Sequence, residues 1–167
     1  NIYFAKAALK IGYDDFMAGL DRLGFNQKLP FEISVAESQY SNADRIETEI
    51  QLADSGYGQG QVLVNPVHLA SLYTMYPNRG KVLKPYLVYK DTPEPEVWIE
   101  DACTPETAEI VEDGMKAVIS SEHGTGHAAM RSDITLAGKT GTAEIKASKE
   151  DTSGTELGWF AVYTADA

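Results

Sequence analysis

Residues 137–144 read AGKTGTAE, and this short stretch carries most of what the sequence predicts. Lys139 is followed by two threonines, Thr140 and Thr142, with Gly141 between them. An ammonium group and a hydroxyl can together bind a carboxylate, and a glycine lets a ligand lie against an extended strand. A backbone N–H of the same strand could face a developing oxyanion. The stretch therefore predicts a strand that binds the carboxylate of a small substrate.

Two other interpretations of this stretch compete with the first. Residues 138–140 match the end of the phosphate-binding pattern G-x-x-x-x-G-K-[ST]. However, Asp133 stands where that pattern needs its first glycine, and the residues after Gly141 favour a strand over a helix. The remaining interpretation is a surface hairpin with an exposed lysine, which a three-residue match alone would favour. The rest of the chain has to decide among the three.

The last third of the chain has the pattern of β-strands. We predict one strand over 134–145 and its partner over 157–164, joined by a polar segment. Apolar residues occur at successive positions of the second strand, so we expect a central strand that is covered on both faces. These apolar residues are Leu157, Trp159, Phe160, Ala161, Val162 and Tyr163.

The N-terminal part has helical periodicity. One helix is expected to end at Gly12, and a second is expected over 14–23, with Gly24 just past its end. Residues 25–64 are predicted to be mostly irregular, and a connection of that length is often functional. The apolar residues that define the two helices are Phe4, Ala8 and Ile11 in the first, and Phe16, Leu20 and Leu23, expected to be buried, in the second.

Two further helices have start signals. Residues 65–66, Asn-Pro, predict a helix that ends near residues 78–80, and residues 104–105, Thr-Pro, predict another. A short strand is expected over 86–89. The apolar stripe of the first helix is Leu69, Leu72, Tyr73 and Tyr76, and that of the second is Ile110, Val111, Met115, Val118 and Ile119.

Helices followed by a strand pair predict an α+β fold. We expect one domain over 1–167, with a helical part to about residue 125 and the strand pair over about 132–167. The formal charge of −11 argues against nucleic acid and against an anionic membrane surface as partners. The single cysteine, Cys103, excludes an intrachain disulfide. The chain opens at Asn1, without an initiator methionine, so we expect a longer parent protein.

The histidines are weak candidates for a metal site. His123 and His127 flank residues 124–126, Gly-Thr-Gly, and a glycine loop lacks the helical register of H-x-x-x-H sites. We expect both to be solvated loop residues. His68 falls within the helix that follows Pro66 and is expected to be partly buried or hydrogen-bonded.

Five segments follow one another along the chain. They are GQG at 58–60, NPVHLA at 65–70, NRG at 78–80 with KPYLV at 84–88, GTG at 124–126 before AGKTGTAE, and GWF at 158–160. Lys-Thr-Gly on a strand is a signature of penicillin-binding proteins and β-lactamases, together with S-x-x-K and S-D-N. In order and spacing, the five segments resemble class B penicillin-binding proteins. The resemblance covers the whole chain, although Asn65 replaces the usual threonine.

This resemblance implies a penicillin-binding protein/β-lactamase-like transpeptidase fold, in which helices flank a five-stranded antiparallel sheet. The fold would be incomplete here: the chain looks like the C-terminal part of the domain, with Asn1 as the last residue of the S-x-N motif. No lysine has a serine three positions before it, so S-x-x-K is expected upstream. The fragment is therefore expected to be inactive alone, and marginally stable or self-associating because of its open strand edges.

The resemblance also implies a peptidoglycan D,D-transpeptidase that forms a serine acyl-enzyme and binds β-lactams. Lys139 and Thr140 would hold the substrate carboxylate, and Lys139 would join the proton network. Gly141 would allow close approach, and the Thr142 N–H would supply half of the oxyanion hole, with the other half from the serine upstream. Asn1 would bind the acyl side chain's amide.

The parent would be anchored in the cell membrane, with this domain on the extracytoplasmic face. Its partners would be D-Ala-D-Ala stem peptides, β-lactam antibiotics and other cell-wall and division proteins; no metal or organic cofactor is implied. The alternatives are a β-lactam sensor or β-lactamase on the same fold, a non-catalytic binding module, and a nucleotide-binding domain.

Overall fold

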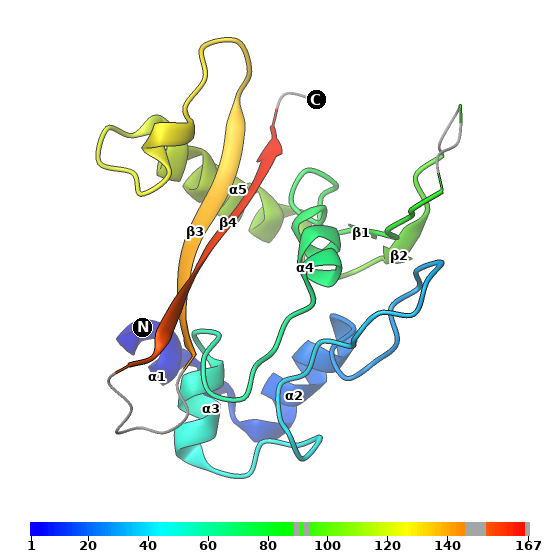
Figure 1. Ribbon diagram of the computed structural model, residues 1–167, viewed down its shortest axis with the longest axis vertical. Coiled ribbons are helices and arrows are strands. Elements are labelled where there is room, and N and C mark those ends of the chain that lie inside the picture. Colours follow the sequence, from blue (N-terminus) through cyan, green and yellow to red (C-terminus); the bar gives the residue numbers. More distant parts are fainter. Residues whose placement is uncertain (89–90, 92–93, 146–152, 166–167) are drawn as a thin grey trace. The chain divides into compact units, whose positions relative to one another are not determined.

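The computed structural model describes residues 1–88, 91, 94–145 and 153–165. Its elements confirm the predicted α+β class: helices dominate the first part, and a long strand pair closes the chain (Figure 1). The chain divides into two compact units. The first unit is Asn1–Leu72 with Val82–Ala102, and the second unit is Tyr73–Lys81 with Cys103–Ala167.

The first unit opens with two helices whose ends were correctly predicted. Helix α1, Ile2–Ile11, ends at Gly12, which has a φ of 87° and donates its N–H to the Ala8 carbonyl at 3.0 Å. Helix α2, Tyr13–Arg22, is followed closely by Gly24, whose φ of 85° few other residues adopt. The expected burial was wrong, since Phe16, Leu20 and Leu23 are only half-buried.

The region expected to be irregular contains a helix. Helix α3, Glu49–Ser55, begins at Thr48, whose Oγ1 accepts the Gln51 N–H at 3.2 Å. The Gln51 side chain reaches back to accept the Glu47 N–H at 3.1 Å. Thr-x-x-Gln is a capping pattern, so the sequence did contain the signal for this helix. Helix α3 packs on α1, where Gly56 leaves no room for a Cβ beside Ala8.

Helix α4, Pro66–Tyr73, starts as predicted, because the Asn65 side-chain oxygen accepts the Val67 N–H at 2.9 Å. Its end, expected near residues 78–80, was wrong, since turns follow Tyr73. The strand expected over 86–89 was wrong for its described residues, and Tyr89 lies outside them. Strands β1, Val82–Leu83, and β2, Val97–Ile99, form the antiparallel pair of this region instead. The Leu87 N–H donates to the Glu32 carboxylate at 3.0 Å rather than to a strand.

A neutral histidine lies in the core of the first unit. His68 is fully buried, and its ring lies 5.2 Å from that of Phe25 and 5.4 Å from that of Trp98, measured between ring centroids. Its Nε2 lies 2.8 Å from the Leu23 carbonyl, which can only accept, so Nε2 carries the proton. Its Nδ1, 2.7 Å from Ser38 Oγ, therefore accepts from that hydroxyl. Burial lowers the pKa of His68.

Acidification is expected to destabilise the first unit through His68. Because the folded pKa lies below the unfolded value of about 6.5, the unfolded chain binds more protons once the pH falls below that value. The free energy of unfolding should then decrease by up to about 1.4 kcal/mol per pH unit. Urea unfolding at several pH values would measure this slope. A His68→Gln variant should have a shallower slope between pH 7 and 5, and equal slopes would contradict the assignment.

The second unit is built on one long helix and a hairpin. Helix α5, Pro105–Ser120, starts as predicted at Thr104, whose Oγ1 accepts the Thr107 N–H at 3.2 Å. Its buried residues are Ala108, Met115 and Ile119, so the predicted apolar stripe is buried only in part: Ile110 and Val111 are 72% and 37% exposed. The inward face of the helix is rotated from the one that the apolar residues alone indicated.

The predicted strand pair is present. Strands β3, Leu136–Ile145, and β4, Thr155–Thr164, run antiparallel from Leu136 opposite Thr164 to Ile145 opposite Thr155. The linking segment lies largely outside the described residues. Burial of β4 on both faces was wrong: Trp159, Ala161 and Tyr163 are half-buried, whereas Leu157, Phe160 and Val162 are exposed. Among the described elements, α5 is the one helix with extensive contacts to the hairpin strand β3.

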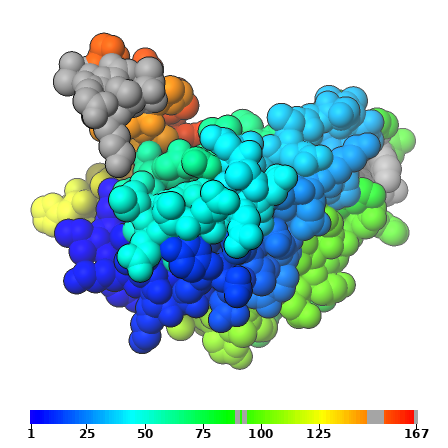
Figure 2. All heavy atoms as spheres, turned by 90° about the horizontal axis from the view of Figure 1, so that it is seen from below, coloured from blue at the N-terminus to red at the C-terminus, as the bar shows by residue number. Residues whose placement is uncertain are grey.

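Apolar side chains are also exposed on the first unit. Helix α1 lies at its surface, dark blue in Figure 2, and Ile2, Tyr3 and Phe4 are all more than half exposed. In the part of the chain that the structure describes, no helix is long and apolar enough to cross a membrane.

Candidate functional site

The residues predicted to bind a carboxylate lie side by side on β3. Lys139 is paired with Ala161 of β4, Thr140 with Phe160, and Thr142 with Gly158. The strand continues without interruption to Ile145, so no helix begins after the Lys-Thr-Gly sequence. A phosphate-binding loop needs such a helix, and that alternative is therefore excluded. The motif is displayed on a hairpin strand, as the sequence predicted.

The Lys139 ammonium group is available to an anion. The side chain is exposed, and Nζ donates to the carbonyl oxygen of Thr140 at 2.5 Å. Among the described residues, no carboxylate forms an ion pair with Lys139, in contrast to Lys84 and Lys116, which lie 2.8 Å and 2.7 Å from Glu96 and Glu112. The positive charge of Lys139 is thus not neutralised by these carboxylates, as a carboxylate site requires.

The two glycines of the motif have different surroundings. A Cβ on Gly138 would lie 2.8 Å from the Ala161 carbonyl oxygen and 3.2 Å from Ile119 Cδ1, so packing requires glycine there. A Cβ on Gly141 would meet only the Trp159 Cβ, at an ordinary 3.5 Å. Packing within the second unit therefore explains Gly138 but not Gly141.

Asn1 belongs to the first unit. It occupies the N-cap position of α1, and its carbonyl accepts the Ala5 N–H at 2.9 Å. Its exposed side chain makes no capping hydrogen bond. Local helix capping therefore does not account for an asparagine side chain at this position. Of the predicted site residues, the structure brings together Lys139, Thr140, Gly141 and Thr142 on one strand.

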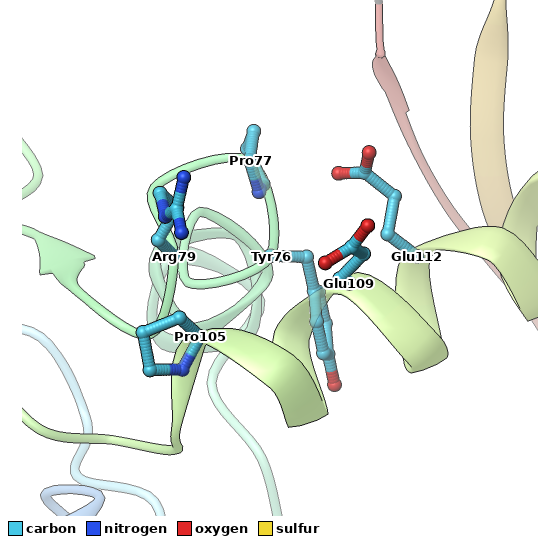
Figure 3. Close-up of a pocket in the computed structure, with 6 residues that line it drawn as sticks. All are labelled: Tyr76, Pro77, Arg79, Pro105, Glu109 and Glu112. Carbon is cyan, nitrogen blue, oxygen red and sulfur yellow. The ribbon is translucent and has the colours of Figure 1, made fainter.

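A hollow of about 220 Å³ lies in the second unit (Figure 3). Arg79 and Pro77 line it from the turn that follows α4, and Glu109 and Glu112 line it from α5. None of the predicted site residues lines it. We therefore take the exposed strand, and not this hollow, as the candidate site.

Sequence reasoning missed one residue beside the motif. Thr125 Oγ1 lies 2.7 Å from Thr140 Oγ1, so the loop after α5 contacts β3 at the predicted site. The surrounding Gly-Thr-Gly was recognised only as a matching segment.

The prediction for the flanking histidines, that both are solvated, was correct in part. His123 is exposed, but His127 is half-buried, and its Nδ1 lies 3.0 Å from the Ile119 carbonyl.

Comparison with known proteins agrees with this geometry. An α+β domain that displays Lys-Thr-Gly on a hairpin strand is typical of the penicillin-binding and β-lactamase class of proteins. The family model described as the penicillin binding protein transpeptidase domain matches residues 1–167. The chain therefore belongs to the penicillin-binding protein transpeptidase domain family.

Two curated relatives extend the comparison. The chain is 44% identical over 163 residues to penicillin-binding protein 3 of Bacillus subtilis. The aligned region covers 98% of this chain and 24% of that protein. It is 26% identical over 191 residues to the peptidoglycan D,D-transpeptidase MrdA of Haemophilus influenzae, covering 98% of this chain and 29% of that protein. The chain thus spans only about a quarter of the length of these relatives.

Solved structures confirm the predicted fold. The crystal structure of PBPA from Mycobacterium tuberculosis has a TM-score of 0.79 at 21% identity, covering 97% of this chain and 37% of that chain. The D,D-transpeptidase domain of a peptidoglycan glycosyltransferase from Eggerthella lenta has a TM-score of 0.74 at 24% identity. The match covers 98% of this chain and 42% of that chain. The α+β transpeptidase fold expected from the sequence is therefore shown.

Proposed function

We propose that the chain is part of a peptidoglycan D,D-transpeptidase that works through a serine acyl-enzyme and binds β-lactams. The observation that carries the proposal is Lys139 on a Lys-Thr-Gly strand of a transpeptidase-family domain, where no carboxylate of the described residues forms an ion pair with it. A nucleophilic serine outside these residues would attack the D-Ala-D-Ala bond, form an acyl-enzyme with release of the terminal D-alanine, and then pass the acyl group to an amine. The match of one family model to residues 1–167 supports treating both units as parts of one domain.

Each residue of the strand has a role in this proposal. The Lys139 ammonium and the Thr140 hydroxyl bind the carboxylate of the stem peptide or drug, and Lys139 also joins the proton network at the leaving group. Gly141 lets the ligand approach the strand. The Thr142 N–H supplies half of the oxyanion hole, where preorganised donors stabilise the developing charge. Asn1 binds the amide of the acyl side chain.

The ligands and the location follow from the same proposal. One solved neighbour, penicillin-binding protein A of Mycobacterium tuberculosis, is described as an imipenem acyl-enzyme complex, which supports β-lactams as ligands here. We place the domain on the extracytoplasmic face of the membrane, where peptidoglycan is assembled, with other cell-wall and division proteins as partners.

Labelling with a fluorescent penicillin tests the proposal. The full-length protein should become covalently labelled, and an excess of unlabelled benzylpenicillin should abolish the label. The isolated 167 residues should remain unlabelled, because they contain no S-x-x-K sequence. A full-length protein that is folded but takes up no label would overturn the proposed catalysis. Labelling of the isolated chain would show that the nucleophile lies within it.

A further inference from the structure

Thr125 forms a hydrogen bond with the proposed carboxylate-binding residue Thr140. The two Oγ1 atoms are 2.7 Å apart, although 15 residues separate them in the sequence. Both residues belong to the second unit. We propose that Thr125 is a positioning residue, which orients the Thr140 hydroxyl toward the carboxylate of the substrate or drug. This inference rests on the proposed function, because it assigns a role within the same site.

The backbone on either side holds Thr125 in place. A Cβ on Gly124 would collide with the Val118 carbonyl oxygen, and the Gly126 N–H donates to the same carbonyl at 3.1 Å. A Cβ on Gly126 would lie 3.2 Å from Val118 Cγ1 and 3.4 Å from Phe160 Cε2. The loop is therefore packed against the last turn of α5 and against β4. Thr125, flanked by two glycines that allow this packing, supplies the side chain that contacts β3.

The chemistry of the ligand sets the direction of the bond. A carboxylate has no proton to donate, so Thr140 must donate its hydroxyl proton to it. The Thr140 oxygen is then left with lone pairs only, and the hydrogen bond at 2.7 Å requires Thr125 to donate. In this arrangement Thr125 fixes the rotation of the Thr140 hydroxyl while the ligand is bound. It also polarises that hydroxyl, which strengthens the bond to an anion.

A pair of substitutions separates this role from a purely structural one. Thr125→Val removes the donor but keeps the shape of the side chain, whereas Thr125→Ser keeps the donor. In the full-length protein, Thr125→Val should slow acylation by benzylpenicillin roughly five- to tenfold, the usual effect of losing one hydrogen bond, and Thr125→Ser should restore most of the rate. Acylation of the methyl ester, which lacks the carboxylate, should be slow in all variants and indifferent to Thr125.

A double-mutant cycle completes the test. Because Thr125 acts through Thr140, adding Thr125→Val to Thr140→Val should cause no further loss. Equal slowing of the acid and the ester by Thr125→Val, or additive losses in the cycle, would overturn the inference. Acylation of Thr125→Val at the wild-type rate would also overturn the inference. If the wild-type protein is not acylated at all, the proposed function has failed instead. In that case the cycle, measured on the equilibrium affinity for benzylpenicillin, decides whether the two threonines are coupled.

Discussion

Acylation of the full-length protein by a fluorescent penicillin is expected to become roughly 100-fold slower when Lys139 is replaced by alanine, because a charge-assisted bond to the ligand carboxylate is lost. The lost group is the Lys139 ammonium on β3, which donates to the Thr140 carbonyl oxygen. Its side chain is exposed, so the substitution should leave the fold intact. Stopped-flow or gel-based labelling over a range of drug concentrations would measure the second-order rate constant of acylation.

Two control variants make the result specific. Lys84→Ala removes another lysine, one that is paired with Glu96 at 2.8 Å, and acylation should not change. Lys139→Arg keeps the positive charge, but the planar fork of a guanidinium cannot replace a compact ammonium group without a change in geometry. We expect the acylation rate constant of Lys139→Arg to lie between those of Lys139→Ala and the wild type. Wild-type labelling of Lys139→Ala would show that another group binds the carboxylate.

The sequence predicted what depends on local chemistry. The starts of α4 and α5 were correct because Asn65 and Thr104 cap the first turn of each helix with their own side chains. The residues predicted to bind a carboxylate were correctly placed on a strand, because they are contiguous in an extended segment. Helix α3 was missed although its start at Thr48 has the same kind of local signal, so that error was avoidable.

The predictions that were wrong concern features that depend on contacts between residues far apart in the sequence. The apolar residues of α5 do not reveal which of its sides meets β3: Ile119 is buried, whereas Ile110 is exposed. In the region of the strand expected over 86–89, the Leu87 N–H donates to the Glu32 carboxylate, 55 residues away, and not to a neighbouring strand. Thr125 was overlooked for the same reason, since its contact with Thr140 exists only once the loop after α5 packs against the hairpin.

The two glycines of the Lys-Thr-Gly strand are expected to respond to alanine in opposite ways. Gly138→Ala places a Cβ 2.8 Å from the Ala161 carbonyl oxygen, a backbone atom that cannot move alone. Overpacking of this kind should lower the free energy of unfolding by roughly 2–3 kcal/mol. Gly141→Ala meets only the Trp159 Cβ at 3.5 Å, so stability should stay within about 0.5 kcal/mol of the wild type.

Activity should show the reverse order. If the ligand lies against β3 at Gly141, a methyl group there takes up part of its place, and acylation should be slowed at least tenfold, as expected for a misplaced substrate. Gly138→Ala, assayed well below its melting temperature, should keep most of its acylation rate. Thermal unfolding and penicillin labelling of the same two preparations would measure both properties. Since each variant is the other's control, a Gly141→Ala protein that is stable and fully acylated would remove Gly141 from the site, while leaving Lys139 and Thr140 in it.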